Sequence, residues 1–594
     1  MQVNEPSSIH EMLKETVDKC GHRDAYKWFS SPGQLESVSW DGFYQQVKSV
    51  SKSLISLGVN KGDKVNIQSY SCYRWVLSDI GISNIGACTV GIYHSNLAND
   101  CRYIIDHSDA VLIFAEDENQ LEKLLEIRDQ IPRIRKVIMF SPYNGDDDWV
   151  ISYEDFLSLG RDIQDEVFEE RIKEVGPQDP AAIVYTSGTT GVPKGAVLTN
   201  SNITFTAGSV VSSVMAEDED ETFLFLPLAH VFAKVCVFTA LKNGNATVFA
   251  RDITTVVEDI ALARPHWFAS VPRIYEKIYS KVISGAETKG GIALKIFNWA
   301  MATGKAYGKY KLNKQPPPKG LELKFKLAEK LVFSKIQAAL GGRVKWCISG
   351  AAPIDPTIAE FFHSAGILIL EGIGMTENTS FTNINRYDNY RFGWVGPPGQ
   401  GIEQKIAHDG EVMFKGPNVM KEYYKMPEKT SETITSDGWL YTGDLGEIDS
   451  ENFLKIIGRK KDLIITAGGK NIAPAPIEGV MATSKYINQI CIIGDKKKFL
   501  SAIVTLDPDT VPEYAEKNNI SFNSLEDLVE NPGIKELIEA EINEKNRQFA
   551  SFETVKKVIL VPEFTIANGL VTPTLKLKKS IIKNKYETEI NALY

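Results

Sequence analysis

The sequence predicts an α/β protein with a large N-terminal body of several subdomains and a small α+β C-terminal domain. The chain has 594 residues, which is too long for one hydrophobic core. Apolar, strand-like runs alternate with helical patterns through most of its length, as in parallel sheets whose strands are joined by helices. Near residue 458 this pattern gives way to a charged stretch and a new set of short elements. We therefore expect a body at residues 1–457 and a C-terminal domain at residues 458–594.

The body is expected to contain mostly parallel strands. Between Val38 and Glu116 the pattern predicts two helices, one at residues 72–87 and a polar one after it, and strands at residues 64–70, 88–94 and 110–116. The same alternation returns later in the chain. Further strands are predicted at residues 221–230, 245–250, 266–272 and 344–350.

A lysine-rich helical stretch follows between Gly285 and Gly342, with a break at the proline-rich sequence NKQPPPKG. A solvated surface excursion explains this composition. A second interpretation is that the basic segment 300–345, which contains LELKFKLAEKLVF, makes peripheral contact with an anionic membrane surface. The sequence leaves both interpretations open.

The C-terminal domain is expected to combine strands with charged helices. Apolar strand-like runs are found at residues 487–495 and 499–507, and charged helical patterns and a lysine-rich tail follow them. This mixture of short elements is typical of a small α+β domain.

Composition excludes several classes of protein. The net charge of −10 argues against nucleic acid as a partner. The seven cysteines are scattered without a C-x-x-C pair, which indicates reduced thiols and neither a disulfide framework nor a zinc site. The first twenty residues lack the apolar core of a secretory signal, and no run of about 18 apolar residues occurs. We therefore expect a cytoplasmic protein that does not span a membrane.

A glycine-rich stretch from Tyr185 to Asn202, YTSGTTGVPKGAVLTNSN, follows a short apolar run. Glycine turns after a strand bring backbone N–H groups close to phosphate oxygens. The spacing from Gly188 to Lys194 matches a Walker loop, but Pro193 replaces the second glycine and Gly195 replaces the hydroxyl that would bind magnesium. The stretch therefore indicates a phosphate-binding loop of another kind. A plain surface turn is the alternative.

Four further motifs follow in order: SGAAPI at Ser349–Ile354, EGIGMTENTS at Glu371–Ser380, GWLYTGDLGEI at Gly438–Ile448 and GRKKDLIITAGGKNIAP at Gly458–Pro474. Together with the glycine-rich loop they resemble the adenylate-forming, AMP-binding superfamily. Within it, the stretches LPLAHVF, GGKNIAPAPIE, KFLSAIVTLD and LVTPTLKLKK are most similar to long-chain and bubblegum-type fatty acyl-CoA synthetases. The resemblance covers nearly the whole chain and implies the adenylate-forming enzyme fold, with a mobile C-terminal cap.

The resemblance implies a nucleotide site that spans several motifs. The loop residues would bind the β and γ phosphates of ATP through hydroxyls, backbone N–H groups and one cation, and Asp444 and Arg459 would bind the ribose. Thr186 and Glu377 would hold Mg²⁺, a hard ion that prefers oxygen ligands. The full set is Thr186, Ser187, Gly188, Thr189, Thr190, Gly191, Lys194, Gly350, Ala351, Glu371, Gly372, Ile373, Thr376, Asp444, Arg459 and Lys461.

Four side chains are expected to take part in catalysis, and each also has a structural explanation. The resemblance places His230 beside the acyl–phosphate junction, although an isolated histidine is usually structural, and here it ends an apolar strand-like run. Thr376 and Glu377 would contact the α-phosphate and Mg²⁺, or else Thr376 would cap a helix with Glu377 in its first turn. Lys576 would reach the α-phosphate and carboxylate, or else be a solvated tail cation.

Three further expectations concern residues around these groups. Lys461 matches the family hinge, at which the C-terminal domain rotates between half-reactions. Ile373 stands where relatives usually carry an aromatic residue that stacks on adenine. The apolar residues Val231, Phe232, Phe238, Trp267 and Phe268 line an acyl channel or belong to the core, and the pattern fits both.

The implied function is the ATP-dependent, AMP-forming ligation of a long-chain fatty acid to coenzyme A through an acyl-adenylate. Its small molecules are ATP, Mg²⁺, the fatty acid and coenzyme A. Two alternatives are an acyl-AMP ligase that loads a carrier protein and an adenylating oxygenase of the luciferase type. A nucleotide sensor is disfavoured because Lys194, Glu377, Asp444 and Lys576 are all present. The sequence leaves chain length and oligomeric state open.

Overall fold

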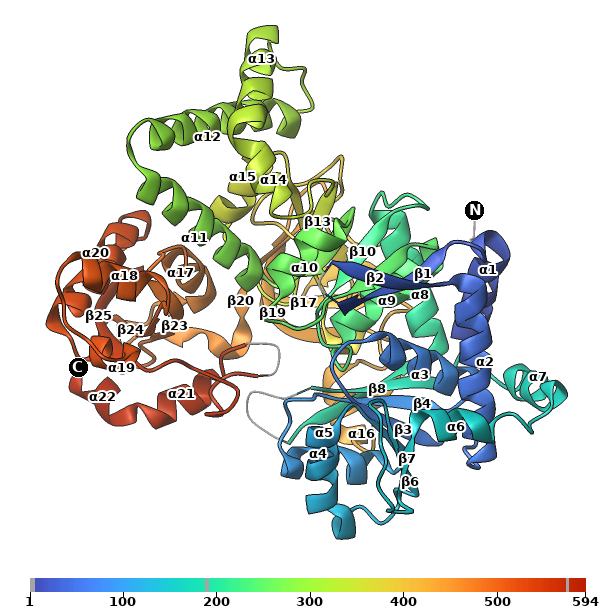
Figure 1. Cartoon of the computed structure of the whole chain (residues 1–594). Coiled ribbons are helices and arrows are strands. Elements are labelled where there is room, and N and C mark those ends of the chain that lie inside the picture. Colours follow the sequence, from blue (N-terminus) through green and yellow to red (C-terminus); the bar gives the residue numbers. More distant parts are fainter. Residues whose placement is uncertain (1–5, 32, 187–191, 573–575) are drawn as a thin grey trace.

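The computed structural model describes residues 6–31, 33–186, 192–572 and 576–594. Two large sheets build the body, and a smaller domain of red and orange elements lies beside it (Figure 1). No helix within these residues is long and apolar enough to cross a membrane. The α/β architecture predicted from the alternating pattern is confirmed.

The first large sheet lies in the middle of the body. Its central strands are parallel, as predicted, and an antiparallel strand closes each edge. In spatial order the strands are β15 (Asn383–Ile384), β14 (Leu368–Ile373), β13 (Trp346–Ser349), β12 (Trp267–Ser270), β10 (Glu221–Leu224), β11 (Ala246–Phe249), β1 (Asp24–Ser31) and β2 (Gln34–Ser39).

The second large sheet carries the glycine-rich loop between two of its strands. In spatial order its strands are β18 (Glu422–Tyr423), β9 (Lys194–Thr199), β8 (Pro180–Thr186), β4 (Cys88–Ile92), β3 (Lys64–Gln68), β5 (Ala110–Ala115), β6 (Lys136–Met139) and β7 (Val150–Ser152). Strands β3 to β8 run parallel, whereas β9 and β18 are antiparallel to their neighbours.

Helices cover both faces of these sheets. One group packs together in the main hydrophobic core and consists of α1 (Ile9–Cys20), α2 (Trp40–Ser56), α3 (Tyr73–Asn84), α8 (Asn200–Ser213) and α9 (Val231–Asn243). A separate cluster on the second sheet includes α4 (Ala98–Ser108) and α5 (Glu118–Glu126). The other body helices are α6 (Tyr153–Leu159), α7 (Asp165–Lys173), α10 (Val256–Ala263), α11 (Pro272–Lys289), α14 (Ser334–Ala338), α15 (Pro356–Ser364) and α16 (Pro427–Thr433).

A helical protrusion occupies the lysine-rich stretch. Helix α12 (Gly291–Leu312) is followed by a proline-rich break and by α13 (Lys319–Ala328), which passes through a π-turn, η2 (Glu329–Phe333), into α14. Helix α12 ends at its C-cap Asn313, and Lys314 then has a left-handed φ of 52°, so the break begins just before the prolines. The predicted surface excursion is confirmed, and Figure 1 shows it standing out from the body.

A third sheet connects the body to the C-terminal domain. It contains β16 (Glu403–Ile406), β17 (Glu411–Lys415), β19 (Leu440–Ile448) and β20 (Leu454–Arg459). The chain leaves the sheet at Arg459 and makes a short turn, η4 (Lys460–Asp462). The division at residues 457 and 458 remains a prediction.

The C-terminal domain folds around its own core. A hairpin of β21 (Ile464–Ile465) and β22 (Asn471–Ile472) precedes a sheet of β23 (Ile487–Ile493), β24 (Leu500–Leu506) and β25 (Val555–Val561). Apolar side chains of this sheet are buried in two clusters. The helices are α17 (Pro474–Met481), α18 (Thr510–Lys517), α19 (Leu525–Val529), α20 (Pro532–Lys545), α21 (Lys579–Lys585) and α22 (Glu587–Ala592).

Contacts with α11 join this domain to the body. The Lys485 ammonium lies 2.5 Å from a Glu287 carboxylate oxygen, and the Arg273 guanidinium donates to the Asn488 side chain. Both body residues lie on α11, whereas Lys485 comes just before β23 and Asn488 lies in that strand. These polar contacts hold the two parts in one arrangement.

Candidate active site

Strands β8 and β9 present the glycine-rich loop. Thr186 ends β8 directly opposite Lys194, which begins β9. The Thr186 hydroxyl approaches the Lys194 carbonyl oxygen at 3.5 Å. The loop residues Ser187, Gly188, Thr189, Thr190 and Gly191 lie outside the described part of the chain, so their phosphate-binding role stays a prediction.

The Lys194 ammonium lies 4.0 Å from the centre of the Tyr423 ring. The Tyr423 hydroxyl in turn donates to the Glu377 carboxylate. Burial lowers the pKa of Lys194, and the nearby Glu377 opposes that shift. Burial and Glu377 raise the pKa of Tyr423, so its hydroxyl stays protonated as a donor. Tyr423 therefore connects the expected phosphate-binding cation to the expected magnesium ligand.

Thr376 and Glu377 are both buried in a short 3-10 turn, η3 (Thr376–Asn378), that follows β14. The residue at the N-cap is Met375, so the alternative in which Thr376 caps the turn is wrong. The turn begins at Thr376, one residue earlier than a Thr376 cap would require. Glu377 does lie in the first turn, as that alternative expects, but Thr376 is not the cap.

Glu377 offers the only expected metal-binding carboxylate of the described residues. No group of three or more His, Cys, Asp or Glu that could hold a metal ion occurs in the described ranges. Mg²⁺ is usually held by one or two carboxylates together with substrate phosphates and water. A single buried carboxylate beside a phosphate-binding cation fits that mode of binding.

His230 lies beyond the first sheet and not at the end of a strand. Strand β10 ends at Leu224, and His230 is the N-cap of α9. The expectation of a strand up to His230 is wrong because Pro227 has no N–H for a ladder and begins a turn that closes between Pro227 and His230.

The ring of His230 has a defined protonation state. The Phe232 backbone N–H donates to His230 Nδ1 at 3.1 Å, so Nδ1 accepts and Nε2 carries the proton. Burial, together with the Lys576 cation, lowers the pKa of His230 to about 3. The imidazole is therefore neutral near pH 7 and offers one N–H donor at Nε2.

Asp444 and Arg459 face each other across β19 and β20. They occupy paired positions of the ladder, and the Arg459 Nε donates to the Asp444 carboxylate at 2.8 Å. Burial raises the pKa of Asp444, whereas Arg459 lowers it. A second guanidinium nitrogen of Arg459 reaches the Thr442 carbonyl at 3.4 Å. The expected pair of ribose-binding groups is therefore assembled.

Lys576 reaches the same place from the C-terminal domain. Although its side chain keeps solvent-exposed surface, surrounding protein and Arg459 lower its pKa, and Asp444 and Glu377 raise it. Lys576 also acts on His230. Charged groups far apart in sequence therefore act electrostatically on this one cation.

Two consecutive lysines in the turn after β20 have different surroundings. The Lys460 ammonium lies 2.6 Å from Asp409 and 3.0 Å from Glu411, so this residue is tied to the body. Lys461 is exposed, and its positive charge lowers the pKa of Lys194. Lys461 is thus the first residue after the ion pairs that Lys460 makes with the body.

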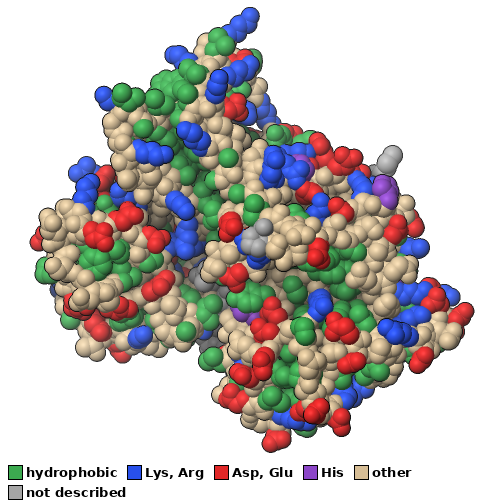
Figure 2. Space-filling model, viewed as in Figure 1, with side chains coloured by type: hydrophobic (Ala, Val, Ile, Leu, Met, Phe, Trp, Pro, Cys, Tyr) green, Lys and Arg blue, Asp and Glu red, His purple; other side chains and the backbone are tan. Residues whose placement is uncertain are grey.

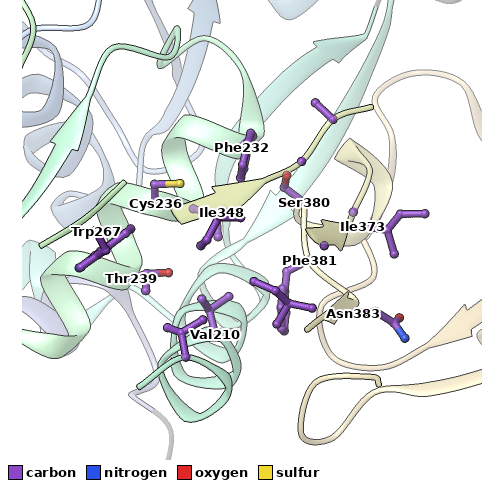
Figure 3. Close-up of a pocket in the computed structure, with 17 residues that line it drawn as sticks. Val210, Phe232, Cys236, Thr239, Trp267, Ile348, Ile373, Ser380, Phe381 and Asn383 are labelled. Carbon is purple, nitrogen blue, oxygen red and sulfur yellow. The ribbon is translucent and has the colours of Figure 1, made fainter. Parts of the chain in front are cut away.

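An apolar pocket with about 560 Å³ of empty space, including its open mouth, adjoins these groups. Four expected nucleotide residues line it, namely Gly350, Ala351, Gly372 and Ile373. Figure 3 shows Ile373 and Asn383 at one side and Trp267, Cys236 and Thr239 at the other. The pocket therefore extends from the nucleotide motifs towards α9 and β12, and its apolar lining suits an apolar group.

Only some of the residues expected to line an acyl channel line this pocket. Phe232 and Trp267 line it, whereas Val231, Phe238 and Phe268 are buried in the core. Glu371 is also buried, and burial raises its pKa to about 8, so it is largely protonated at neutral pH. Its carboxyl accepts from the Ile354 backbone N–H at 3.5 Å.

Comparison with known proteins identifies the family. The profile of the AMP-binding enzyme family matches residues 13–424, and that of the AMP-binding enzyme C-terminal domain matches residues 461–594. The chain belongs to the AMP-binding enzyme family.

Relatives cover nearly the whole chain. A long-chain-fatty-acid–CoA ligase of Mycobacterium tuberculosis, FadD15, is 32% identical over 92% of this chain and 91% of its own. The Xenopus laevis long-chain-fatty-acid–CoA ligase ACSBG2 is 33% identical over 99% of this chain and 84% of its own. The human ACSBG2 is 30% identical over 99% and 92%.

Solved structures share the fold. The adenylation domain of a carboxylate reductase from Mycobacterium chelonae superposes with a TM-score of 0.77, at 20% identity over 100% of this chain and 92% of that chain. The anthranilate-CoA ligase AuaEII, solved with anthranoyl-AMP, gives 0.71 at 18% identity over 98% of both chains. The adenylate-forming fold is confirmed.

Proposed function

We propose that the protein joins a long-chain fatty acid to coenzyme A in an ATP-dependent, AMP-forming reaction. Two features support this proposal. The charge of Lys576 lowers the pKa of His230, and Asp444 and Glu377 raise the pKa of Lys576. An apolar pocket is lined by residues of the expected nucleotide motifs. The names of the relatives, which are long-chain-fatty-acid–CoA ligases, support the same substrate class.

In the first half-reaction a carboxylate oxygen of the acid attacks the α-phosphorus of ATP, and pyrophosphate leaves. Lys194 and the glycine-rich loop bind the phosphates that depart, and Lys576 offsets the negative charge that develops at the α-phosphate. The neutral His230 donates its Nε2–H to an oxygen at the junction. Asp444 and Arg459 hold the ribose hydroxyls.

Glu377, with Thr186, would hold Mg²⁺ in this site. Bound there, the ion would neutralise phosphate charge and orient the triphosphate. Tyr423 fixes the carboxylate of Glu377 by its hydrogen bond and so prepares it as a ligand.

In the second half-reaction the thiol of coenzyme A attacks the acyl carbonyl of the adenylate, and AMP leaves. Lys576 is not needed for this step, so the C-terminal domain is free to turn. Rotation at Lys461 would carry Lys576 out of the site and open a path for the thiol.

The pocket favours an acid with an apolar chain. Its lining includes Val210 and Val214 of the α8 end, Val235 and Cys236 of α9, and Trp267 of β12. These side chains provide no cation for a second carboxylate. Burial of methylene groups here would contribute about 0.8 kcal/mol each, which favours longer chains up to the length of the pocket.

A screen of saturated acids from acetate to very long chains tests this function. AMP release with coenzyme A present should be largest for long chains and should require all three substrates. Light and CO₂ with the acid and oxygen would indicate an oxygenase instead, and acylation of a carrier protein in preference to coenzyme A would indicate a loading enzyme. Absence of AMP with every acid would overturn the proposal.

We also propose a cytoplasmic location. All seven cysteines are free thiols, and six of them are buried. Burial raises the pKa of Cys236, which lines the pocket, to about 12, so it is an unreactive apolar residue there.

A further inference from the structure

The protrusion formed by α12, α13 and η2 stands out from the body (Figure 1), and it carries exposed apolar side chains. Leu323, Leu327 and Leu331 are 70%, 49% and 42% exposed. Their spacing of four residues places them in one row along α13 and η2. Leucines in such a row usually face a core, whereas this row faces solvent.

The opposite side of the same helix is already packed. Phe325 stacks on Tyr307 of α12 with ring centres 4.1 Å apart, and it also contacts Phe333. Ala328 and Phe333 are fully buried. The inner apolar face therefore holds the helix in place. The leucine row forms a second apolar face, and no part of the described chain covers it.

Lysines surround the leucine row on both sides. A helical projection places Lys319, Lys326 and Lys330 along one side and Lys324 and Lys335 along the other, all with exposed side chains. The glutamates Glu322 and Glu329 fall outside the row. This is the pattern of a helix that lies in a membrane interface, with apolar groups in the acyl boundary and cations at the headgroups.

The charge of the protrusion opposes that of the whole chain. Residues 291–335 contain ten lysines, two glutamates and no aspartate or arginine, which gives +8, whereas the whole chain carries −10. The remainder therefore carries −18. Figure 2 shows the blue side chains beside green ones on the part of the surface that protrudes. Positive charge and exposed leucines thus coincide.

We propose that this leucine and lysine face docks the protein onto the surface of a bilayer that contains anionic lipids. A cation-flanked row fits a flat anionic surface, because apolar and charged contacts form in one plane. Pairing of this face with itself in a second copy would bring the two sets of lysines together. The rest of the chain is acidic, so anionic headgroups repel it. This repulsion orients the protrusion towards the membrane surface.

Cosedimentation with vesicles tests the proposal. The Lys576→Ala variant should bind vesicles of phosphatidylcholine with phosphatidylserine as the unchanged protein does, so docking is scored separately from catalysis. Binding to pure phosphatidylcholine should be much weaker, and added salt should weaken binding to the anionic vesicles. Equal binding to both kinds of vesicle would overturn the proposal.

Paired variants locate the surface. Leu323→Ser with Leu327→Ser should reduce vesicle affinity about tenfold or more. Lys324→Gln, Lys326→Gln and Lys330→Gln should each reduce it about fivefold. Leu97→Ser is the matched apolar control, since Leu97 is 69% exposed at the start of α4, and Lys517→Gln with Lys535→Gln is the charge control.

Two results would contradict the assignment. Unchanged vesicle binding in the double leucine variant, with its melting temperature intact, would exclude this face. A double leucine variant that loses self-association in analytical ultracentrifugation, and keeps vesicle binding, would identify the face as a contact between copies of the chain.

Discussion

Lys576 is the residue on which the proposed chemistry depends most. It comes from the C-terminal domain, yet its charge acts on His230 in the body and is itself influenced by Asp444 and Glu377. Its pKa is lowered by its surroundings and by Arg459. The Lys576 side chain is therefore charged below this lowered pKa and loses its charge as the pH rises through it. An ordinary lysine would lose its proton only at a higher pH.

We predict that Lys576→Ala slows adenylation by roughly two to three orders of magnitude, because one cation aimed at developing charge is removed. Acid-dependent exchange of labelled pyrophosphate into ATP measures this. In the unchanged protein, kcat/KM for this exchange should fall at alkaline pH, and Lys576→Arg should remove that fall because a guanidinium stays charged.

Lys578→Ala is the control for this prediction, since Lys578 is the neighbouring tail lysine and the N-cap of α21. It should leave exchange almost unchanged. A normal exchange rate in Lys576→Ala, or a large loss in Lys578→Ala alone, would contradict the assignment.

Tyr423 is expected to position Glu377 for Mg²⁺. Tyr423→Phe keeps the ring beneath Lys194 and removes the hydroxyl that donates to Glu377. We predict a roughly five- to tenfold higher Mg²⁺ concentration for half-maximal exchange, since a hydrogen bond to a charged group contributes about 1.5–3 kcal/mol and solvent partly replaces it.

The neighbouring tyrosine provides a matched control. Tyr424 also donates to a carboxylate, Asp109, at 2.9 Å. Tyr424→Phe should leave the Mg²⁺ dependence unchanged. A lower Mg²⁺ requirement in Tyr423→Phe would show that the hydroxyl competes with the ion and does not prepare its ligand.

Ile373 lines the pocket, and the resemblance implies an aromatic residue at this position. Ile373→Tyr should restore stacking on adenine, worth about 0.5–1.5 kcal/mol beyond area burial. The KM for ATP should therefore fall roughly two- to twelvefold with kcat nearly constant. Ile373→Leu should change neither. An effect confined to the acid substrate would mean that Ile373 contacts the acyl chain.

At the residue scale, the sequence indicated polar groups but not their partners. Thr376, Glu377 and Lys194 were expected from motifs, and Asp444 with Arg459 from an implied ribose site. Tyr423 was missed because its contact with Glu377 joins residues 46 apart and is created by the pairing of β18 with β9. The sequence KEYYKMPEKT contains only an aromatic pair before a helix, and nothing in it points to a carboxylate.

At the element scale, the turn η4 between β20 and the C-terminal domain is the expected hinge. Lys460 is held to Asp409 and Glu411 of the body, so rotation must begin after it. Lys461 follows directly and is exposed. The backbone of Lys461 is thus the first that can turn without breaking those two ion pairs.

We predict that Lys461→Pro separates the half-reactions. Proline fixes φ near −65° and removes the rotation, so adenylation should persist while transfer to coenzyme A is greatly slowed. Lys461→Ala, which leaves φ free, is the control. Pyrophosphate exchange and single-turnover thioester formation from purified acyl-adenylate measure the two steps. Equal loss in both steps of Lys461→Pro would contradict a hinge.

Among the elements, regular strands and helices could be predicted because their periodicity is local. The strand predicted at 221–230 is longer than the observed strand β10. An apolar run alone does not show where the hydrogen-bonded ladder ends, and the turn that begins at Pro227 follows shortly after β10. The π-turn η2 has no sequence signal, since it depends on how α13 packs against α12.

At the scale of the whole molecule, two domains share one site. Contacts of α11 with Lys485 and Asn488 hold the C-terminal domain where Lys576 acts on His230 of the body, and this is the arrangement that we propose for adenylation. Sequence motifs could imply that both domains contribute but not which arrangement is adopted, because that depends on polar contacts such as Lys485 with Glu287. The two groups of this pair are 198 residues apart.

The central claim is that the acid is activated as an adenylate. The most direct measurement uses a long-chain acid with oxygen-18 in both carboxylate positions, together with ATP, Mg²⁺ and coenzyme A, and mass analysis of the products. One labelled oxygen should appear in AMP, because the carboxylate oxygen that attacks the α-phosphorus stays with it when the thiol displaces AMP. Unlabelled AMP, or label in inorganic phosphate with ADP as the product, would contradict the account.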